Sequence, residues 1–249
     1  MKTKKTTPAY FSELEIKMPT GYQDLNQKQL RYVYLLMSQQ RTADEIKTYC
    51  FLRFAGMMVL KRVASEVYEV RSGMRTYNVS VASIAASLSV LDWLEKPAPF
   101  PTRLEQIGKA KALPPLMQRL PFGQFLVLEM LYQGFILSQN YEAIQDMAAI
   151  MYPGLNKKLD GPEIQNIIMW FCSAKLYYAY KWTYLFAKSD DDDGEDDIDP
   201  EKNMNTMLRA LTGGHPEREK DIEALDTFRA LEELDQKARE AQEFKEKTH

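Results

Sequence analysis

The sequence predicts a mainly α protein, with a helical globular domain that carries one small β-hairpin, an acidic linker and a C-terminal helical segment. Three observations lead to this prediction. Apolar side chains recur three and four positions apart over most of residues 1–188, a spacing that places them on one face of a helix. One short stretch instead alternates β-branched or aromatic residues with polar ones, as strands do. A run of carboxylates then precedes a last helical pattern.

Length and composition are compatible with this fold class. The chain has 249 residues, of which 45% are hydrophobic and 27% charged, so it can bury a sizeable core. The N-terminal segment MKTKKTTPAY contains lysines, but no apolar stretch follows them. We therefore expect no secretory signal peptide.

Two helices are expected near the N-terminus. The first begins around Asp24, and the second begins at Thr42, because Thr42 and Glu45 have the spacing of a capping box. The first helix presents one apolar face, formed by Leu30, Val33, Tyr34 and Met37. The second runs through Ile46, Tyr49, Cys50, Phe54 and Met57.

A β-hairpin is expected over residues 67–81. Val67, Tyr68 and Val70 precede Ser72–Gly73, and a second alternating stretch follows this pair. Two alternating runs on either side of a glycine-containing turn are typical of a hairpin.

Helical spacing returns at Val81 and continues to Leu94, and the proline-rich loop at 97–101 must end this helix. A helical pair is expected at residues 122–138 and 141–151. The longest apolar segment, 164–187, is long enough to span a bilayer. Lys175 and Lys181 lie inside it and would each be costly in a membrane, and Asp160 with Glu163 forms a good start for a soluble helix. We therefore predict a buried helix.

The charges divide the chain into three parts. Residues 1–188 contain 23 lysines and arginines and 15 acids, a net charge of +8. Residues 189–201, SDDDDGEDDIDPE, contain nine acids and no basic residue, and residues 202–249 contain nine basic and eleven acidic residues. Such a run of like charges predicts a disordered, solvated linker at 189–201 between a main domain, 1–188, and a C-terminal segment, 202–249. Its spacing does not fit a calcium loop, because Ser189 and Pro200 would occupy the first and last ligand positions.

The C-terminal segment is expected to be a docking element. A short helix through Met204 and Leu211 should end at Gly213–Gly214. The final helix has one narrow apolar stripe that has no partner in its own segment. The stripe must therefore pack on the main domain, on a second copy or on another protein. The predicted partner-docking residues are Ile222, Leu225, Phe228, Leu231 and Leu234.

Catalytic and metal-binding residue types are scarce. The only histidines are His215, in a Gly-Gly-His-Pro turn, and His249, the last residue. Cys50 and Cys172 lie on apolar helix faces, where we expect burial rather than reactivity. The chain contains neither a Walker-type loop nor a GxGxxG turn. We predict no catalytic residue, no metal and no cofactor; an enzyme that uses only carboxylates, lysines or tyrosines is the minor alternative.

The net charge of +8 on residues 1–188 permits nucleic-acid binding. The basic residues are dispersed, however, and no known nucleic-acid-binding motif accompanies them. A basic accessory protein of a phage or mobile element is therefore the second expectation and not the favoured one.

Three stretches carry a resemblance to a family. They are LNQKQLRYVYLLMSQQRTADEIKTYCFLRFAGM, LDWLEKPAPFPTRLEQIGKAKALPPLMQRLPFGQFLVLEMLYQGFI and MLRALTGGHPEREKDIEALDTFRALEELDQKAREAQE. Together they cover about half of the chain and resemble an uncharacterised family encoded in tailed phages and prophages of Bacteroides-type bacteria, associated with tail genes.

The resemblance implies a non-enzymatic virion morphogenesis protein. Within that setting we expect a tail assembly component or a chaperone of the tape-measure protein that acts by helical docking. Its partners would be other tail or virion proteins, or a second copy of itself, and not a membrane. Its place would be the cytoplasm of the bacterial host or the virion itself. The resemblance assigns no functional residue.

Overall fold

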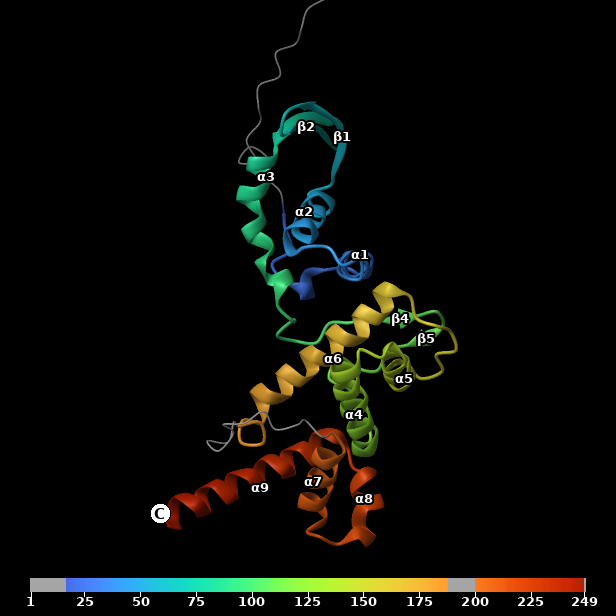
Figure 1. Ribbon diagram of the computed structural model, residues 1–249, viewed down its shortest axis with the longest axis vertical. Coiled ribbons are helices and arrows are strands. Elements are labelled where there is room, and N and C mark those ends of the chain that lie inside the picture. Colours follow the sequence, from blue (N-terminus) through green and yellow to red (C-terminus); the bar gives the residue numbers. More distant parts are fainter. Residues whose placement is uncertain (1–16, 188–199, 249) are drawn as a thin grey trace, which may run out of the picture. The chain divides into compact units, whose positions relative to one another are not determined.

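The computed structural model describes residues 17–187 and 200–248 and confirms the mainly α fold class. Its contacts divide the chain into two compact units, Met1–Ala98 and Pro99–His249 (Figure 1). The division therefore lies in the proline-rich loop, whereas the charge pattern predicted a single domain over 1–188. The reason is that the segments after the acidic run pack on the helices before it, so the acidic run does not separate two cores.

Unit 1 begins with two capped helices. A short 3-10 turn, η2 (Tyr22–Asp24), precedes α1 (Gln27–Met37) and α2 (Ala43–Phe54). The predicted capping box of α2 is confirmed: the Glu45 N–H donates to Thr42 Oγ1 at 3.2 Å, and the Thr42 N–H donates to Glu45 Oε2 at 2.9 Å. These bonds satisfy backbone donors that a helix start otherwise leaves without a partner.

The predicted hairpin is present as β2 (Val67–Ser72) and β3 (Arg75–Ser80), which pair antiparallel on either side of Gly73. A third strand, β1 (Met57–Ala64), pairs antiparallel with β2, so the sheet order is β1-β2-β3. The assignment of Met57 to the second helix was wrong. The helix ends at Phe54, and Gly56, at φ 65°, adopts a left-handed conformation that turns the chain into β1.

After the sheet, α3 (Val81–Ser87) continues directly into a 3-10 helix, η3 (Leu88–Glu95). Ser80 caps α3 by accepting a hydrogen bond from the Ser83 N–H at 3.1 Å. The Tyr22 hydroxyl donates to the Leu94 carbonyl at 3.1 Å and so fastens the start of unit 1 to the end of η3. The core of unit 1 includes the fully buried side chains of Val33, Tyr34, Cys50, Val70 and Leu91.

Unit 2 begins with the small antiparallel pair β4 (Gln106–Ile107) and β5 (Ala110–Lys111). Its helices α4 (Phe122–Ser138) and α5 (Tyr141–Met151) have the predicted bounds. The long helix α6 (Gly161–Lys181) starts with the predicted capping box of Asp160 and Glu163 and ends before residue 187. Among the described residues, no helix combines the length and apolarity needed to cross a bilayer.

Four helical elements follow in the C-terminal part: α7 (Pro200–Thr212), η4 (Pro216–Arg218), α8 (Glu219–Glu223) and α9 (Thr227–Thr248). Helix α7 includes Pro200 and Glu201, which the charge pattern assigned to the linker. The rest of the predicted linker lies outside the described residues. Gly213 and Gly214 follow α7 with φ of 67° and 81°, and they end it as predicted.

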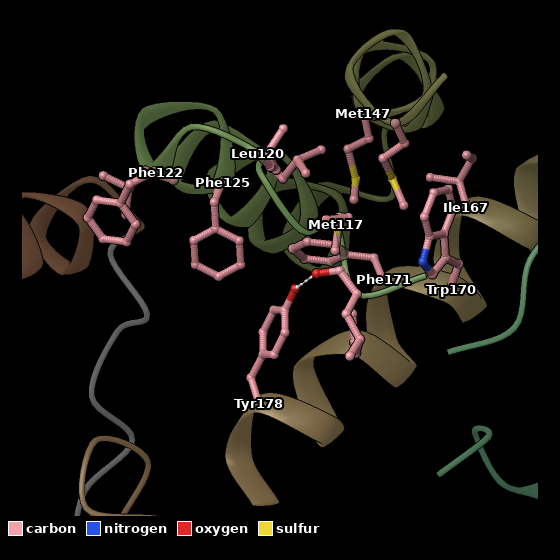
Figure 2. Close-up of a cluster of buried hydrophobic side chains, with 14 of the residues drawn as sticks. Met117, Leu120, Phe122, Phe125, Met147, Ile167, Trp170, Phe171 and Tyr178 are labelled. Atoms are coloured by element: carbon pink, nitrogen blue, oxygen red, sulfur yellow. Dashed lines mark hydrogen bonds between the residues drawn. The ribbon is translucent and has the colours of Figure 1, made fainter. Parts of the chain in front are cut away.

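The core of unit 2 is a cluster of buried apolar side chains to which α4, α5, α6, α7 and α9 contribute; aromatic side chains of α4 and α6 are part of it (Figure 2). Trp170, Phe171 and Tyr178 of α6 are fully buried. The polar ends of two of these side chains are satisfied, because the Tyr178 hydroxyl donates to the Leu116 carbonyl at 2.7 Å and Trp170 Nε1 donates to the Pro115 carbonyl at 2.6 Å. The tyrosines of α6 thus contribute to the core as well as to its rim.

Candidate functional site

The predicted docking stripe lies inside unit 2. Leu231 and Leu234 are buried at 0% and 4% exposure. Ile222, Leu225 and Phe228 are half-buried. The Phe228 ring contacts the rings of Tyr178 and Trp182, with centroids 5.7 and 5.2 Å away. Of the three possible partners of the stripe, the structure shows the chain's own helices. The first of the three alternatives, packing on the chain's own main-domain helices, is thus the one seen for Leu231, Leu234 and Phe228, and docking of these five residues on another protein stays a prediction.

A set of polar contacts holds the start of α9 against residues 119–122, at the start of α4. The Thr227 hydroxyl donates to the Leu120 carbonyl at 2.7 Å, and the Phe122 N–H donates to the Leu225 carbonyl at 2.8 Å. The Asp226 carboxylate accepts from the Arg119 N–H at 2.9 Å and from the Phe228 N–H at 3.0 Å. Asp226 therefore caps α9 and also joins it to the loop that precedes α4. This cap explains why the helix begins at Thr227 and not at Ile222.

The histidines and cysteines do not form a site among the described residues. His215 is exposed, with Nδ1 3.1 Å from Glu217 Oε1, and His249 lies outside the described residues. Cys50 is fully buried, and this burial raises the pKa of its thiol to about 12. Cys172 is half-buried. No group of three or more metal-ligating side chains occurs in the described part of the chain.

The candidate site is an open groove in unit 1, with a volume of about 690 Å³. Side chains of α2 line one part of it, side chains of α3 and η3 another, and residues of β1 and β2 complete the lining. Figure 1 shows the sheet at one end of α2 and α3. The lining side chains are Asp44, Lys47, Thr48, Tyr49 and Leu52 of α2, Val59, Tyr68 and Val70 of the sheet, and Val81, Ile84, Ala85, Leu88, Ser89 and Asp92 of α3 and η3.

Local sequence patterns explain why this lining is mostly apolar. Tyr68 and Val70 are two positions apart on β2, so both point to the same face of the sheet. Ile84 and Leu88 are four positions apart and lie on one helical face. Although the floor residue Val70 is fully buried, Tyr49, Val59 and Val81 remain 42–44% exposed along the groove.

Two of the three charged side chains that line the groove, Lys47 and Asp92, pair with each other. Lys47, 7% exposed, donates to Asp92 Oδ1 at 2.6 Å and also pairs with Glu95. The hydrogen bonds to Asp92 and Glu95 raise the pKa of Lys47, so its ammonium stays charged and held in place. The remaining lining therefore favours an apolar ligand over a charged one.

A second hollow, of about 560 Å³, lies in unit 2 beside α5. Its lining includes Tyr141, Gln145, Lys157 and Lys158. Lys157 Nζ is 2.7 Å from the buried carboxylate of Glu163, which belongs to the capping box at the start of α6. The groove of unit 1 is the larger of the two and has the more continuous apolar lining, so we regard it as the candidate site.

Sequence reasoning missed the groove, although it predicted helices and strands that form its walls. The available signal was a surplus of apolar residues. The faces of α2 and of the segment 81–94 are both broad, and the small hairpin between them cannot cover both.

Comparison with known proteins adds no assignment: no protein-family model matches the chain, and no curated protein or solved structure is significantly similar to it.

Proposed function

We propose that this protein is a non-enzymatic morphogenesis protein of a tailed phage that binds an apolar helix of a tail protein in the groove of unit 1. The observation that carries the proposal is the open apolar lining of that groove between α2 and α3. The proposal keeps helical docking as the mode of action and transfers it from α9 to unit 1.

The geometry favours a helix as the bound element. The floor of the groove is the face of a sheet and not an edge, so it offers no row of backbone groups with which an extended peptide could pair. A helix satisfies its own backbone hydrogen bonds and can enter an apolar groove without leaving donors unpaired. Apolar side chains at every third and fourth position would cover Tyr49, Val59 and Val81.

The phage setting is supported by the resemblance of residues 25–57, 91–136 and 207–243 to proteins encoded near tail genes. An apolar groove that accepts a helix suits a helical client chain. A chaperone of the tape-measure protein is therefore the particular role that we propose.

Two adjacent alanines on α3 provide a matched test. Ala85 lines the groove, whereas Ala86 is also exposed and does not line it. Tagged full-length protein would be captured from phage-producing cells, washed at high salt and analysed by mass spectrometry. We expect tail proteins with the wild type and with Ala86→Asp, and their loss with Ala85→Asp, because a buried carboxylate is costly in an apolar interface.

Equal recovery of tail proteins with both variants would refute docking in the groove.

A second candidate function, nucleic-acid binding, is favoured by four exposed basic residues on the small sheet, namely Lys61, Arg62, Arg71 and Arg75. In the same capture experiment, nucleic acid that stays bound in a low-salt wash and is released in a high-salt wash, with no tail protein recovered, would favour that function.

A further inference from the structure

Among residues 17–187 and 200–248, no strand covers the outer edge of β1. Strand β1 has 8 residues, and all but Met57 are exposed. Its inner edge pairs with β2, and no described strand pairs with its outer edge. Within the described residues, the one other hydrogen bond to its backbone comes from Arg62 Nε, which donates to the Ala64 carbonyl at 3.2 Å. Backbone donors and acceptors along this edge are thus available to another strand.

Four apolar side chains of this edge strand are exposed. Met58 is 54% exposed, and Val59, Leu60 and Val63 are each 44% exposed. Edge strands are commonly protected from pairing by shortness, proline, charged side chains or bulges. β1 has no proline; it carries Lys61, Arg62 and register shifts at Val59/Lys61 and Arg62/Ala64, so its charges select against a basic strand and in favour of an acidic one.

The charge of the sheet indicates which strand would fit. Lys61 and Arg62 lie on β1, and Arg71 and Arg75 lie on the two strands beyond it. Residues 57–80 contain two acids, Glu66 and Glu69. Glu69 Oε2 lies 3.5 Å from Lys61 Nζ, and the Lys61 side chain stays 66% exposed. The edge therefore has an uncompensated positive charge.

Charge does not favour a second copy of the chain as the occupant. In a two-fold antiparallel pairing of whole β1 strands, Lys61 would face Leu60 of the other copy and Arg62 would face Val59, so no acidic side chain would lie opposite either cation.

We propose that β1 accepts an extended segment of a partner protein as a fourth strand, and that this segment alternates acidic and apolar side chains. Backbone hydrogen bonds along β1 supply affinity. Lys61, paired across the strands with Glu69, and Arg62, paired with Tyr68, lie on opposite faces of the sheet, so the acidic side chains of an alternating segment face one of them. Arg62 has no acid opposite it on β2 and selects the acidic residues. This site lies on the edge of the sheet, so it differs from the groove, which uses the inner face, and it does not depend on helix docking there.

The probe is a labelled peptide as long as β1, alternating valine and glutamate, titrated into full-length protein and followed by fluorescence anisotropy. Two control peptides alternate valine with lysine, or carry an N-methyl group on every amide, so that neither edge of the peptide can donate a backbone hydrogen bond. We expect the glutamate peptide to bind at least about tenfold more tightly than either, because charge and main-chain pairing both contribute. Hydrogen exchange should slow at 57–64. Equal binding of the three peptides, or protection elsewhere, would overturn the proposal.

Two charge reversals give a matched pair. Arg62→Glu alters the open edge of β1, whereas Arg75→Glu makes the same change on β3, at the other side of the sheet. With folding verified by circular dichroism, Arg62→Glu should weaken binding of the glutamate peptide by at least about tenfold and Arg75→Glu by less than about threefold. Equal weakening by the two variants would show that binding depends on the overall charge of the sheet, and it would refute a strand-specific site. If duplex DNA also displaced the peptide, the sheet would instead be assigned to nucleic-acid binding.

Discussion

Replacing Leu231 by alanine tests whether the apolar stripe of α9 belongs to the core of unit 2. Leu231 has no exposed surface, and it lies in the same buried cluster as Phe125, Trp170 and Tyr178. A side chain that binds another protein would be exposed to solvent in the isolated chain. A side chain that belongs to the core must lower the free energy of unfolding when it is shortened.

The expected magnitude follows from burial. The substitution removes three carbon atoms, each worth about 0.8 kcal/mol when buried, so the lost transfer free energy alone is about 2.4 kcal/mol. The cavity that remains adds to this loss, and buried leucine-to-alanine changes range over about 2–5 kcal/mol. Because neighbouring aromatic rings are large and hold each other in place, little relaxation is expected, and we predict a loss of about 3–4 kcal/mol.

The assay is urea unfolding followed by tryptophan fluorescence. Trp170 and Trp182 lie in unit 2, whereas Trp93 lies in unit 1. A Trp93→Phe background therefore makes the fluorescence report on unit 2 alone. The matched control is Phe244→Ala on the same helix, because Phe244 is 72% exposed; its effect should stay below about 0.5 kcal/mol.

A loss below about 1 kcal/mol for Leu231→Ala, or a loss equal to that of Phe244→Ala, would refute the core assignment. The stripe would then again be available to a partner.

Three further predictions concern other parts of the molecule. Asn166→Ala should destabilise unit 2 by about 1–3 kcal/mol in urea unfolding, because the amide oxygen of Asn166 accepts from the buried Leu104 N–H at 2.7 Å. Gly56→Ala should cost about 1 kcal/mol in thermal unfolding of unit 1, since φ is 65° and no atom lies within 4 Å of the added Cβ. Stability should fall as pH rises above about 10, the ordinary tyrosine value, because burial raises the pKa of Tyr178, so the unfolded chain loses this proton first.

Each of these has its own control. For Asn166 the comparison is Gln236 of α9, an amide side chain that is exposed to solvent, and an equal effect of Gln236→Ala would contradict the buried role of Asn166. An unchanged melting temperature for Gly56→Ala would contradict the conformational cost. For the alkaline effect, Tyr178→Phe should flatten the decline in stability with pH, and an identical decline would exclude this hydroxyl as its source.

Local sequence signals predicted most of the secondary structure. The capping pairs Thr42/Glu45 and Asp160/Glu163 fixed two helix starts, because a cap depends on residues three positions apart. The glycines at 213–214 marked the end of α7 for a similar local reason. By contrast, β1 was missed because its pattern, MMVLKRVA, has no clear alternation and because its pairing with β2 is a tertiary choice.

The candidate site could not be predicted to the same extent. The apolar stripe of α9 was recognised, but the sequence left three partners open for it. The groove depends on how far apart α2 and α3 lie around the small sheet, and no local pattern encodes that separation.

The sequence by itself therefore determined the fold class, most helix bounds and the hairpin, since these depend on neighbours within a few positions. The scarcity of catalytic residue types follows from composition alone. Only the tertiary structure decided that the chain divides at its prolines, that Leu231 and Leu234 are core, and that apolar surface stays open in unit 1. Burial is a property of contacts between distant segments, and amphipathic patterns state that a face must be covered without stating by what.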